Sequence, residues 1–162
     1  MRNLLRVVDG LRLEATCIYP NSDRGSSGII EAIEAHVGRN GSLTAPFRTA
    51  RSLDRDSYLR LLIDADVLIG NSSSGIIEAA TAGTPAVNVG PRQQGREASG
   101  KSVIHADESY AAIRSAVTRA LDLGPITTSR SVYGDGRAGE RIARLLTQVP
   151  LTDAFRRKLN SY

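Results

Sequence analysis

The sequence predicts an α/β fold, with a Rossmann-like parallel sheet that carries helices on both faces. Short apolar stretches alternate with amphipathic segments along the chain, which is typical of strands that alternate with helices. The apolar run at residues 66–70 is continuous, as in a strand that is buried on both faces of a parallel sheet. Helices between successive strands imply right-handed crossovers.

The elements follow one another in a regular order. Strands are predicted at residues 14–20, within 43–52, and at 66–70, 85–89 and 102–105. Helices are predicted at residues 29–36, after 54, and at 74–81, 110–121 and 137–147, with a further short one possible in the tail. Asp54 is the expected N-cap of the second helix, and Asp107 or Ser109 that of the fourth. Gly83 is the expected stop of the third helix.

Length and composition exclude several classes of protein. The 162 residues fit one domain, and 41% hydrophobic residues are too many for a disordered chain. A single cysteine, Cys17, excludes a disulfide framework and a multi-cysteine metal site, and its place in a strand indicates inert packing. No apolar run is long enough to span a bilayer, and residues 1–9 are too interrupted by charge for a signal peptide. We therefore expect a cytoplasmic protein that does not bind membranes.

The positive charge is almost entirely arginine. The net charge is +4, from 21 basic and 17 acidic residues, and only Lys101 and Lys158 are lysines. The guanidinium fork suits phosphate and carboxylate groups, although a GC-rich genome would also supply arginine. Because the arginines are spread among acids and aromatic residues make up only 4% of the chain, we expect no nucleic-acid partner.

The segment from residue 66 to 78 carries the clearest functional signal. A strand ends at Gly70, the residues from 71 to 75 are small and polar, and a helix is expected to follow. The carboxyl ends of strands are the ligand-binding edge of open α/β sheets, and the free N–H groups of a helix N-terminus favour phosphate. Alternatively, Ser72, Ser73 and Ser74 only cap the helix. The segment is neither a Walker loop nor a dinucleotide fingerprint.

Three further polar residues are candidates for a ligand site. Glu78 could accept hydrogen bonds from a ribose diol, or it could be an ordinary helix glutamate. Arg92 follows the next strand and could reach a phosphate or sugar on the same rim, or pair with Glu97 or another acid. Asn21 follows the first strand and could bind a sugar hydroxyl, or simply form a turn.

The sequence disfavours a serine hydrolase, because it lacks a complete nucleophile elbow and a well-placed histidine. A nucleophile elbow needs glycine two residues on either side of one serine, and Ser73 has Gly75 but also Asn71. The base would have to be His36 or His105, and neither lies in a loop at a strand end. Two histidines also leave little material for a zinc centre, so no metal is expected.

Together, the motifs resemble the C-terminal half of UDP-N-acetylglucosamine 2-epimerases. They are GNSSSGIIEA at residues 70–79, GTPAVNVG at 83–90, RQQGRE at 92–97, YPNSD at 19–23 and YGDG at 133–136. The resemblance covers about residues 14–146. The serine triplet and the RQQGRE loop are similar to the hydrolysing branch, which serves sialic-acid-type sugar pathways.

This resemblance implies one lobe of a glycosyltransferase-B-type architecture, so that residues 1–162 form a single nucleotide-sugar-binding domain. It implies that Ser72 and Ser73 bind the diphosphate and that Glu78 binds the ribose. Arg92 and Asn21 would line the cleft, and the backbone around Leu53 would meet the uracil. The residues expected to bind the UDP-sugar are therefore Asn21, Leu53, Ser72, Ser73, Glu78 and Arg92.

The family reaction removes the proton at sugar C2, eliminates UDP and adds water to the resulting glycal. This gives free N-acetylmannosamine without a metal, nicotinamide or other cofactor. The helix end and the serine donors would stabilise the charge on departing UDP. UDP and UDP-N-acetylglucosamine are therefore the expected ligands.

The chain departs from the family pattern because the N-terminal lobe, which carries most of the catalytic carboxylates, is not represented. Residues 1–13 are too few to replace it, so the catalytic acid and base are unknown and we expect no turnover from this chain alone. The alternatives are a glycosyltransferase donor-binding lobe and a free-standing nucleotide-sugar module. An N-terminal lobe or a second copy is a possible partner of the apolar face with Ile142, Leu145 and Leu146, although core packing is the favoured interpretation of that face.

Overall fold

In the computed structural model, five short strands form two parallel sheets within the described residues, which are 1–38, 45–96, 102–127, 132–150, 152, 153 and 157. The strands are β1 (Ala15–Ile18), β2 (Phe47–Ala50), β3 (Leu68–Gly70), β4 (Ala86–Val89) and β5 (Val103–Ala106). β1 pairs with β2, and the other three follow the order β3-β4-β5. The α/β class and the parallel pairing are confirmed, although the described pairing divides the strands between two sheets.

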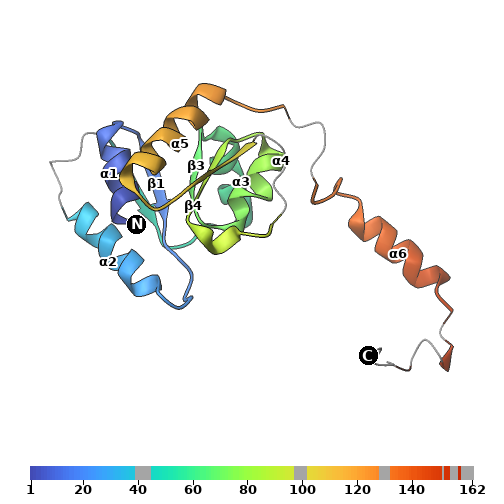
Figure 1. The fold of residues 1–162 in the computed structure, drawn as a ribbon. Helices are drawn as coiled ribbons and strands as arrows, with labels where there is room; N and C mark the ends of the chain where they lie inside the picture. The colour runs from blue at the N-terminus through green and yellow to red at the C-terminus, as the bar shows by residue number, and fades with distance from the viewer. Residues whose placement is uncertain (39–44, 97–101, 128–131, 151, 154–156, 158–162) are drawn as a thin grey trace.

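An α-helix follows each strand except β4, after which the described residues contain a 3-10 turn (Figure 1). The helices are α1 (Arg2–Gly10), α2 (Ser26–Val37), α3 (Arg55–Asp64), α4 (Glu78–Ala82), α5 (Tyr110–Leu123) and α6 (Ala138–Gln148), with 3-10 turns η1 (Ser73–Gly75) and η2 (Pro91–Gln93). The predicted elements do not include α1, whose short apolar runs are interrupted by charged residues. None of the helices in the described ranges is both long and apolar enough to cross a membrane.

The central strand β4 is covered on both faces. Val87 packs in a cluster with residues of α1 and α5, such as Val7 and Val117. The preceding residue, Ala86, packs in a second cluster with Leu62 of α3 and Ala79 of α4. Because successive strand residues point to opposite faces, these two clusters establish helices on both sides of the sheet.

Local signals set the ends of the helices. The Asp54 side chain accepts a hydrogen bond of 3.0 Å from the backbone N–H three residues later, as an N-cap does. Ser109, rather than Asp107, caps α5 in the same way at 3.2 Å. Gly83 ends α4 with φ of 79°, and a Cβ there would lie 2.7 Å from the Ile126 carbonyl oxygen, so this position requires glycine.

Two predictions about the middle of the chain are wrong. The helix expected over residues 74–81 is instead the turn η1 followed by the short α4. The Ser73 carbonyl accepts from both Ile76 and Ile77 at 2.9 Å, which tightens the chain into a 3-10 turn before α4 begins. The strand at residues 66–70 is half-buried rather than buried, because β3 is the edge strand beside β4.

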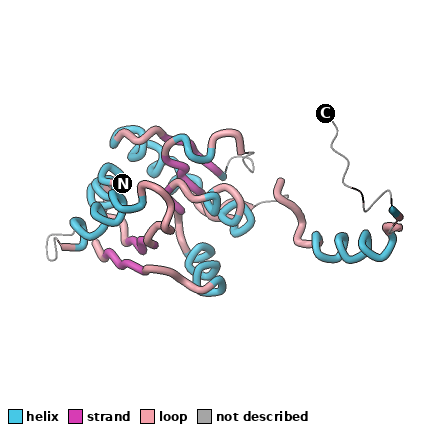
Figure 2. Tube along the Cα trace, turned by 90° about the horizontal axis from the view of Figure 1, so that it is seen from below, coloured by secondary structure: helices cyan, strands magenta, loops and turns pink. Residues whose placement is uncertain are grey.

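The last helix stands apart from the rest of the chain in both views (Figures 1 and 2). α6 has no buried residue, and its apolar side chains Ile142, Leu145 and Leu146 are 56%, 58% and 74% exposed. Core packing of this face is therefore a wrong prediction. An amphipathic pattern identifies an apolar face but does not identify what covers it.

Candidate functional site

Three loops that follow strands meet at Arg92. This residue lies in η2, directly after β4. Its guanidinium donates to the carbonyl oxygen of Asn71, after β3, at 3.1 Å, and to the carboxylate of Asp23, after β1, also at 3.1 Å. The carboxyl ends of β1, β3 and β4 therefore contribute to one rim, as expected for the ligand-binding edge of a parallel fold.

The serine triplet follows β3 on this rim, and its three hydroxyl groups differ in their surroundings. The Ser72 hydroxyl accepts from the N–H of Ser74 at 3.3 Å, which caps η1. The Ser74 hydroxyl is hydrogen-bonded to the Tyr58 hydroxyl of α3. The half-buried Ser73 hydroxyl makes no hydrogen bond within the described part of the chain. Ser72 thus caps the turn η1, and the diphosphate roles of Ser72 and Ser73 stay predictions.

Backbone donors lie beside that hydroxyl. Among the described residues, no acceptor is hydrogen-bonded to the N–H of Ser72 or of Ser73. The Ser72 side chain also retains its own proton to donate, since in the cap it acts as an acceptor. This short turn therefore presents several hydrogen-bond donors and no negative charge of its own, a combination that suits an anion.

Glu78 begins α4, one turn after the serines. Its side chain is half-buried and makes no hydrogen bond or ion pair within the described ranges. A carboxylate can only accept hydrogen bonds when it is ionised, so it suits a ligand with hydroxyl donors. The ordinary-glutamate alternative predicts a solvated side chain, and the half-buried position argues against it.

The side chain of Arg92 is 53% exposed and paired with Asp23, so the ion-pair alternative is confirmed with an acid other than Glu97. Glu97 itself lies outside the described residues. An exposed ion pair between two flexible side chains contributes little stability. Arg92 can therefore exchange Asp23 for a ligand at small cost, and its ligand role stays a prediction.

The two remaining candidates also follow strands. Asn21 is exposed in the loop after β1, and its side chain makes no hydrogen bond among the described residues. Leu53 is half-buried in the loop after β2. Both positions fit the expected edge, and their contacts with sugar and uracil stay predictions.

A sequence profile of the family described as UDP-N-acetylglucosamine 2-epimerase matches residues 1–147. The chain belongs to this epimerase family. The match agrees with the resemblance drawn from the serine triplet and the RQQGRE loop, and it favours an epimerase over a glycosyltransferase.

Individual relatives of the epimerase family differ in the sugar that their names contain. The chain is 37% identical, over 99% of its length, to a UDP-N,N'-diacetylbacillosamine 2-epimerase (hydrolyzing) of Legionella pneumophila. It is 34% identical over 80% of its length to a UDP-N-acetylglucosamine 2-epimerase of Neisseria meningitidis. It is 33% identical over 59% of its length to a GDP/UDP-N,N'-diacetylbacillosamine 2-epimerase (hydrolyzing) of Campylobacter jejuni. The matches span 41%, 33% and 24% of these relatives, so the chain corresponds to less than half of each.

Two residues at the epimerase-family site were missed from the sequence. The sequence predicts only an apolar helix face for Tyr58, but its hydroxyl contacts Ser74. Gln93 is only 4% exposed, and its side-chain N–H donates to the Asn71 carbonyl at 2.8 Å. Its position next to Arg92 was the available signal, but glutamine is mostly exposed in proteins and its burial was not expected.

The other reactive side chains of the epimerase-family chain lie elsewhere. His105 is in β5 and contacts the side chain of Asn88 at 3.1 Å. His36 is buried in α2 and faces Asp9 of α1 at 3.5 Å. Cys17 is half-buried in β1, and burial raises the pKa of its thiol, which fits inert packing.

Proposed function

We propose that this chain is the UDP-binding lobe of a hydrolysing nucleotide-sugar 2-epimerase, which acts together with an N-terminal lobe. The turn after β3 carries the proposal. It offers the two backbone N–H groups of Ser72 and Ser73 together with the Ser73 hydroxyl, which has no partner among the residues that the structure describes, and Glu78 follows one turn later. The donors at Ser72 and Ser73 suit the oxygens of a diphosphate, and the Glu78 carboxylate suits the hydroxyl groups of the ribose joined to it.

The charges of the site support a diphosphate ligand. Arg92 supplies a guanidinium at the same rim, and its present partners are a carbonyl oxygen and the Asp23 carboxylate. Both are oxygen acceptors of the kind that a phosphate would offer. Asn21 and the backbone at Leu53 extend the proposed site toward the sugar and the uracil.

In the proposed reaction, a base removes the C2 proton and the bond from C1 to the UDP oxygen breaks. Water then adds to the glycal, which releases a free 2-acetamido sugar of inverted C2 configuration. This chain contributes the donors that stabilise the negative charge of departing UDP. Asp23 and Asp135 are paired with Arg92 and Arg141, and neither is assigned here as the catalytic base.

The substrate is proposed to be UDP-N-acetylglucosamine. The Legionella and Campylobacter relatives carry diacetylbacillosamine in their names, and the Neisseria relative carries N-acetylglucosamine. UDP occurs in all three names, and of the residues proposed here only Asn21 is assigned to the sugar, while the others are assigned to UDP. Comparing the two UDP-sugars as ligands will therefore separate the sugar specificity from the UDP site.

Isothermal titration calorimetry of the full chain with UDP and UDP-N-acetylglucosamine tests the proposal. We expect both to bind, and Ser73→Ala to weaken UDP binding by about 1.5–3 kcal/mol, the range for a hydrogen bond to a charged group. The matched control is Ser115→Ala on the exposed surface of α5, which should leave the affinity unchanged. Absence of binding by the folded chain would refute the proposal.

A turnover assay tests the requirement for a second lobe. We expect no release of N-acetylmannosamine from this chain alone and release after a family N-terminal lobe is supplied. Turnover by the pure chain would contradict the proposed division of labour between the lobes.

A further inference from the structure

We propose that Gln93 is the residue that positions the phosphate-binding turn, by holding the peptide between Asn71 and Ser72. This inference rests on the proposed UDP site and assigns a role to a side chain that does not itself touch the ligand. Gln93 lies in η2 after β4, while the turn follows β3, so the contact joins two loops of the rim.

The contact is short and buried. The Gln93 side-chain N–H donates to the Asn71 carbonyl oxygen at 2.8 Å, and Gln93 is 4% exposed. Arg92 donates to the same oxygen at 3.1 Å. Two donors from one loop thus converge on a single carbonyl at the end of β3.

Holding this carbonyl fixes the donor that follows it. The peptide bond is planar and trans, so the Asn71 carbonyl and the Ser72 N–H point in opposite directions. With the carbonyl turned toward Gln93, the Ser72 N–H points away from it. That N–H has no acceptor in the described part of the chain and belongs to the proposed phosphate site. Gln93 therefore aims a phosphate donor in advance of binding, which removes part of the ordering cost.

Gln93 is better suited to this role than Arg92. The Arg92 side chain is 53% exposed, is shared with Asp23, and is itself expected to turn toward the ligand. When it turns, it can release the Asn71 carbonyl. The buried amide of Gln93 would then hold the peptide alone.

The oxygen of the Gln93 side-chain amide, Oε1, has different surroundings from the nitrogen. Oε1 is buried and accepts no hydrogen bond from the described residues. A buried unpaired acceptor is unfavourable, and most folded chains avoid it. Within the described ranges, the Gln93 amide therefore uses its donor on Asn71 and leaves its acceptor unpaired.

The experiment compares Gln93→Met with Gln94→Met in the full chain, by titration calorimetry with UDP and by thermal unfolding. Methionine keeps the length of the side chain and removes both polar atoms. We expect Gln93→Met to weaken UDP binding by about 10-fold, the upper range for one hydrogen bond, with little change in melting temperature. Gln94 is the matched control because it is exposed and its side chain makes no hydrogen bond in the described ranges, so Gln94→Met should bind as the unmodified chain does.

A double-mutant cycle separates positioning from a general effect on the fold. In a Ser73→Ala background, Gln93→Met should cost less than about 3-fold, because the Ser72 N–H that Gln93 aims and the Ser73 hydroxyl are proposed to bind the same phosphate, and losing one contact weakens the other. Equal losses in the two backgrounds would overturn the positioning role. If Gln93→Met does not fold, Gln93→Leu provides the same comparison, since it also removes both polar atoms and adds no charge.

The outcomes distinguish the two proposals. Failure of the unmodified folded chain to bind UDP would refute the proposed function, and the inference with it. Binding by the unmodified chain together with equal binding by Gln93→Met would refute the inference alone. A loss of UDP affinity confined to Gln93 variants would support both.

Discussion

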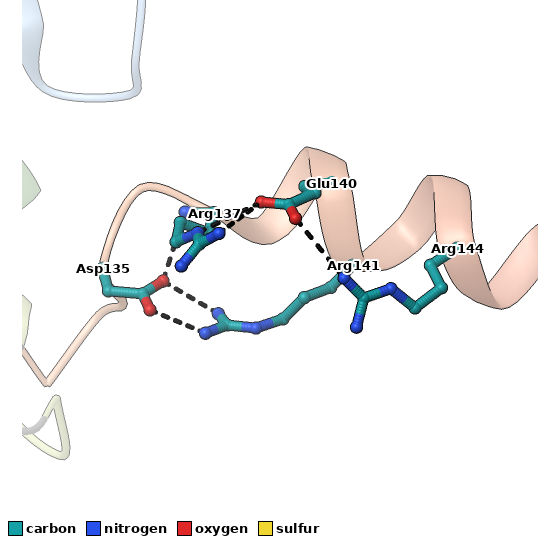
Figure 3. Close-up of polar contacts among 5 residues, drawn as sticks. All are labelled: Asp135, Arg137, Glu140, Arg141 and Arg144. Carbon is teal, nitrogen blue, oxygen red and sulfur yellow. Dashed lines mark hydrogen bonds and ion pairs between the residues drawn. The ribbon is translucent and has the colours of Figure 1, made fainter.

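The body of the chain, from α1 to α5, and the final helix α6 are stabilised in different ways. In the body, apolar side chains such as Val7, Ile113 and Val117 are at most 2% exposed. α6 buries no residue, and ion pairs along its own polar side hold its first turns (Figure 3). Arg137 and Arg144 both pair with Glu140, at 3.0 and 3.4 Å.

The comparison separates two properties that a helical pattern combines. Both α5 and α6 carry an apolar stripe at helical spacing, yet in the described part of the chain only α5 has strands and α1 to bury it. The pattern therefore predicts that a helix forms and which face is apolar. Whether that apolar face contributes to stability depends on which other element packs against it, and the helical spacing of apolar residues does not specify this.

The largest expected effect comes from Ile113→Ala in α5. Ile113 is 2% exposed within the main cluster, so the change leaves a cavity and should lower the free energy of unfolding by about 2–5 kcal/mol. Urea unfolding followed by circular dichroism measures this change.

The matched variant in the other region is Leu145→Ala, at a side chain that is 58% exposed. We expect a change within about 0.5 kcal/mol, because the residue buries little surface. A loss comparable to that of Ile113→Ala would mean that α6 packs on the body, and the contrast between the regions would be wrong.

A smaller effect distinguishes the two helices at their N-termini. Ser109 caps α5, so Ser109→Ala should cost about 1 kcal/mol of stability in the same assay. Ser115→Ala, inside the same helix, keeps the chemical change and should have no such cost. An equal cost in the two serine variants would mean that the Ser109 cap does not stabilise α5. The cap would then not be a difference between α5 and α6, which has no side-chain cap at its first residue.

The sequence was sufficient for features that depend on neighbouring residues. The α/β class follows from the spacing of apolar runs, and the cap at Asp54 and the stop at Gly83 need only local chemistry. The sequence also predicts which edge of the sheet carries the candidate site, because the carboxyl ends of parallel strands meet on one side. These predictions required no knowledge of distant contacts.

Features that depend on distant residues were missed. Asp23 and Arg92 lie 69 positions apart, and Gln93 reaches a carbonyl 22 positions away. Several acids are available to an arginine, so the sequence alone does not select Asp23. The turn η1 was also missed, because the shared hydrogen bonds at Ser73 depend on backbone geometry that residue types only weakly constrain.

The smallest expected effect concerns acid and the start of α6. Two hydrogen bonds from Arg141, together with the Arg137 backbone N–H, lower the pKa of Asp135 from 3.8 to about 2 (Figure 3). Because the pKa is lowered in the folded chain, the stabilisation is fully present above pH 3.8 and is lost as the pH falls through about 2. In the body, the pKa values of Asp54 and Asp107 are also lowered by hydrogen bonds, so a global acid titration would mix the two regions.

A residue-resolved measurement avoids this mixture. The carboxyl carbon of Asp135, followed by NMR, should titrate with a midpoint of about 2, and Arg141→Gln should raise that midpoint toward 3.8 because it removes the main partner. The body should keep its folded chemical shifts in Arg141→Gln at neutral pH, since the pair lies wholly within the α6 region. A midpoint near 3.8 in the unmodified chain would mean that the pair does not form in solution. The start of α6 would then lack the Asp135–Arg141 ion pair. The proposed contrast, in which buried side chains stabilise the body and ion pairs stabilise α6, would be wrong for this part of α6.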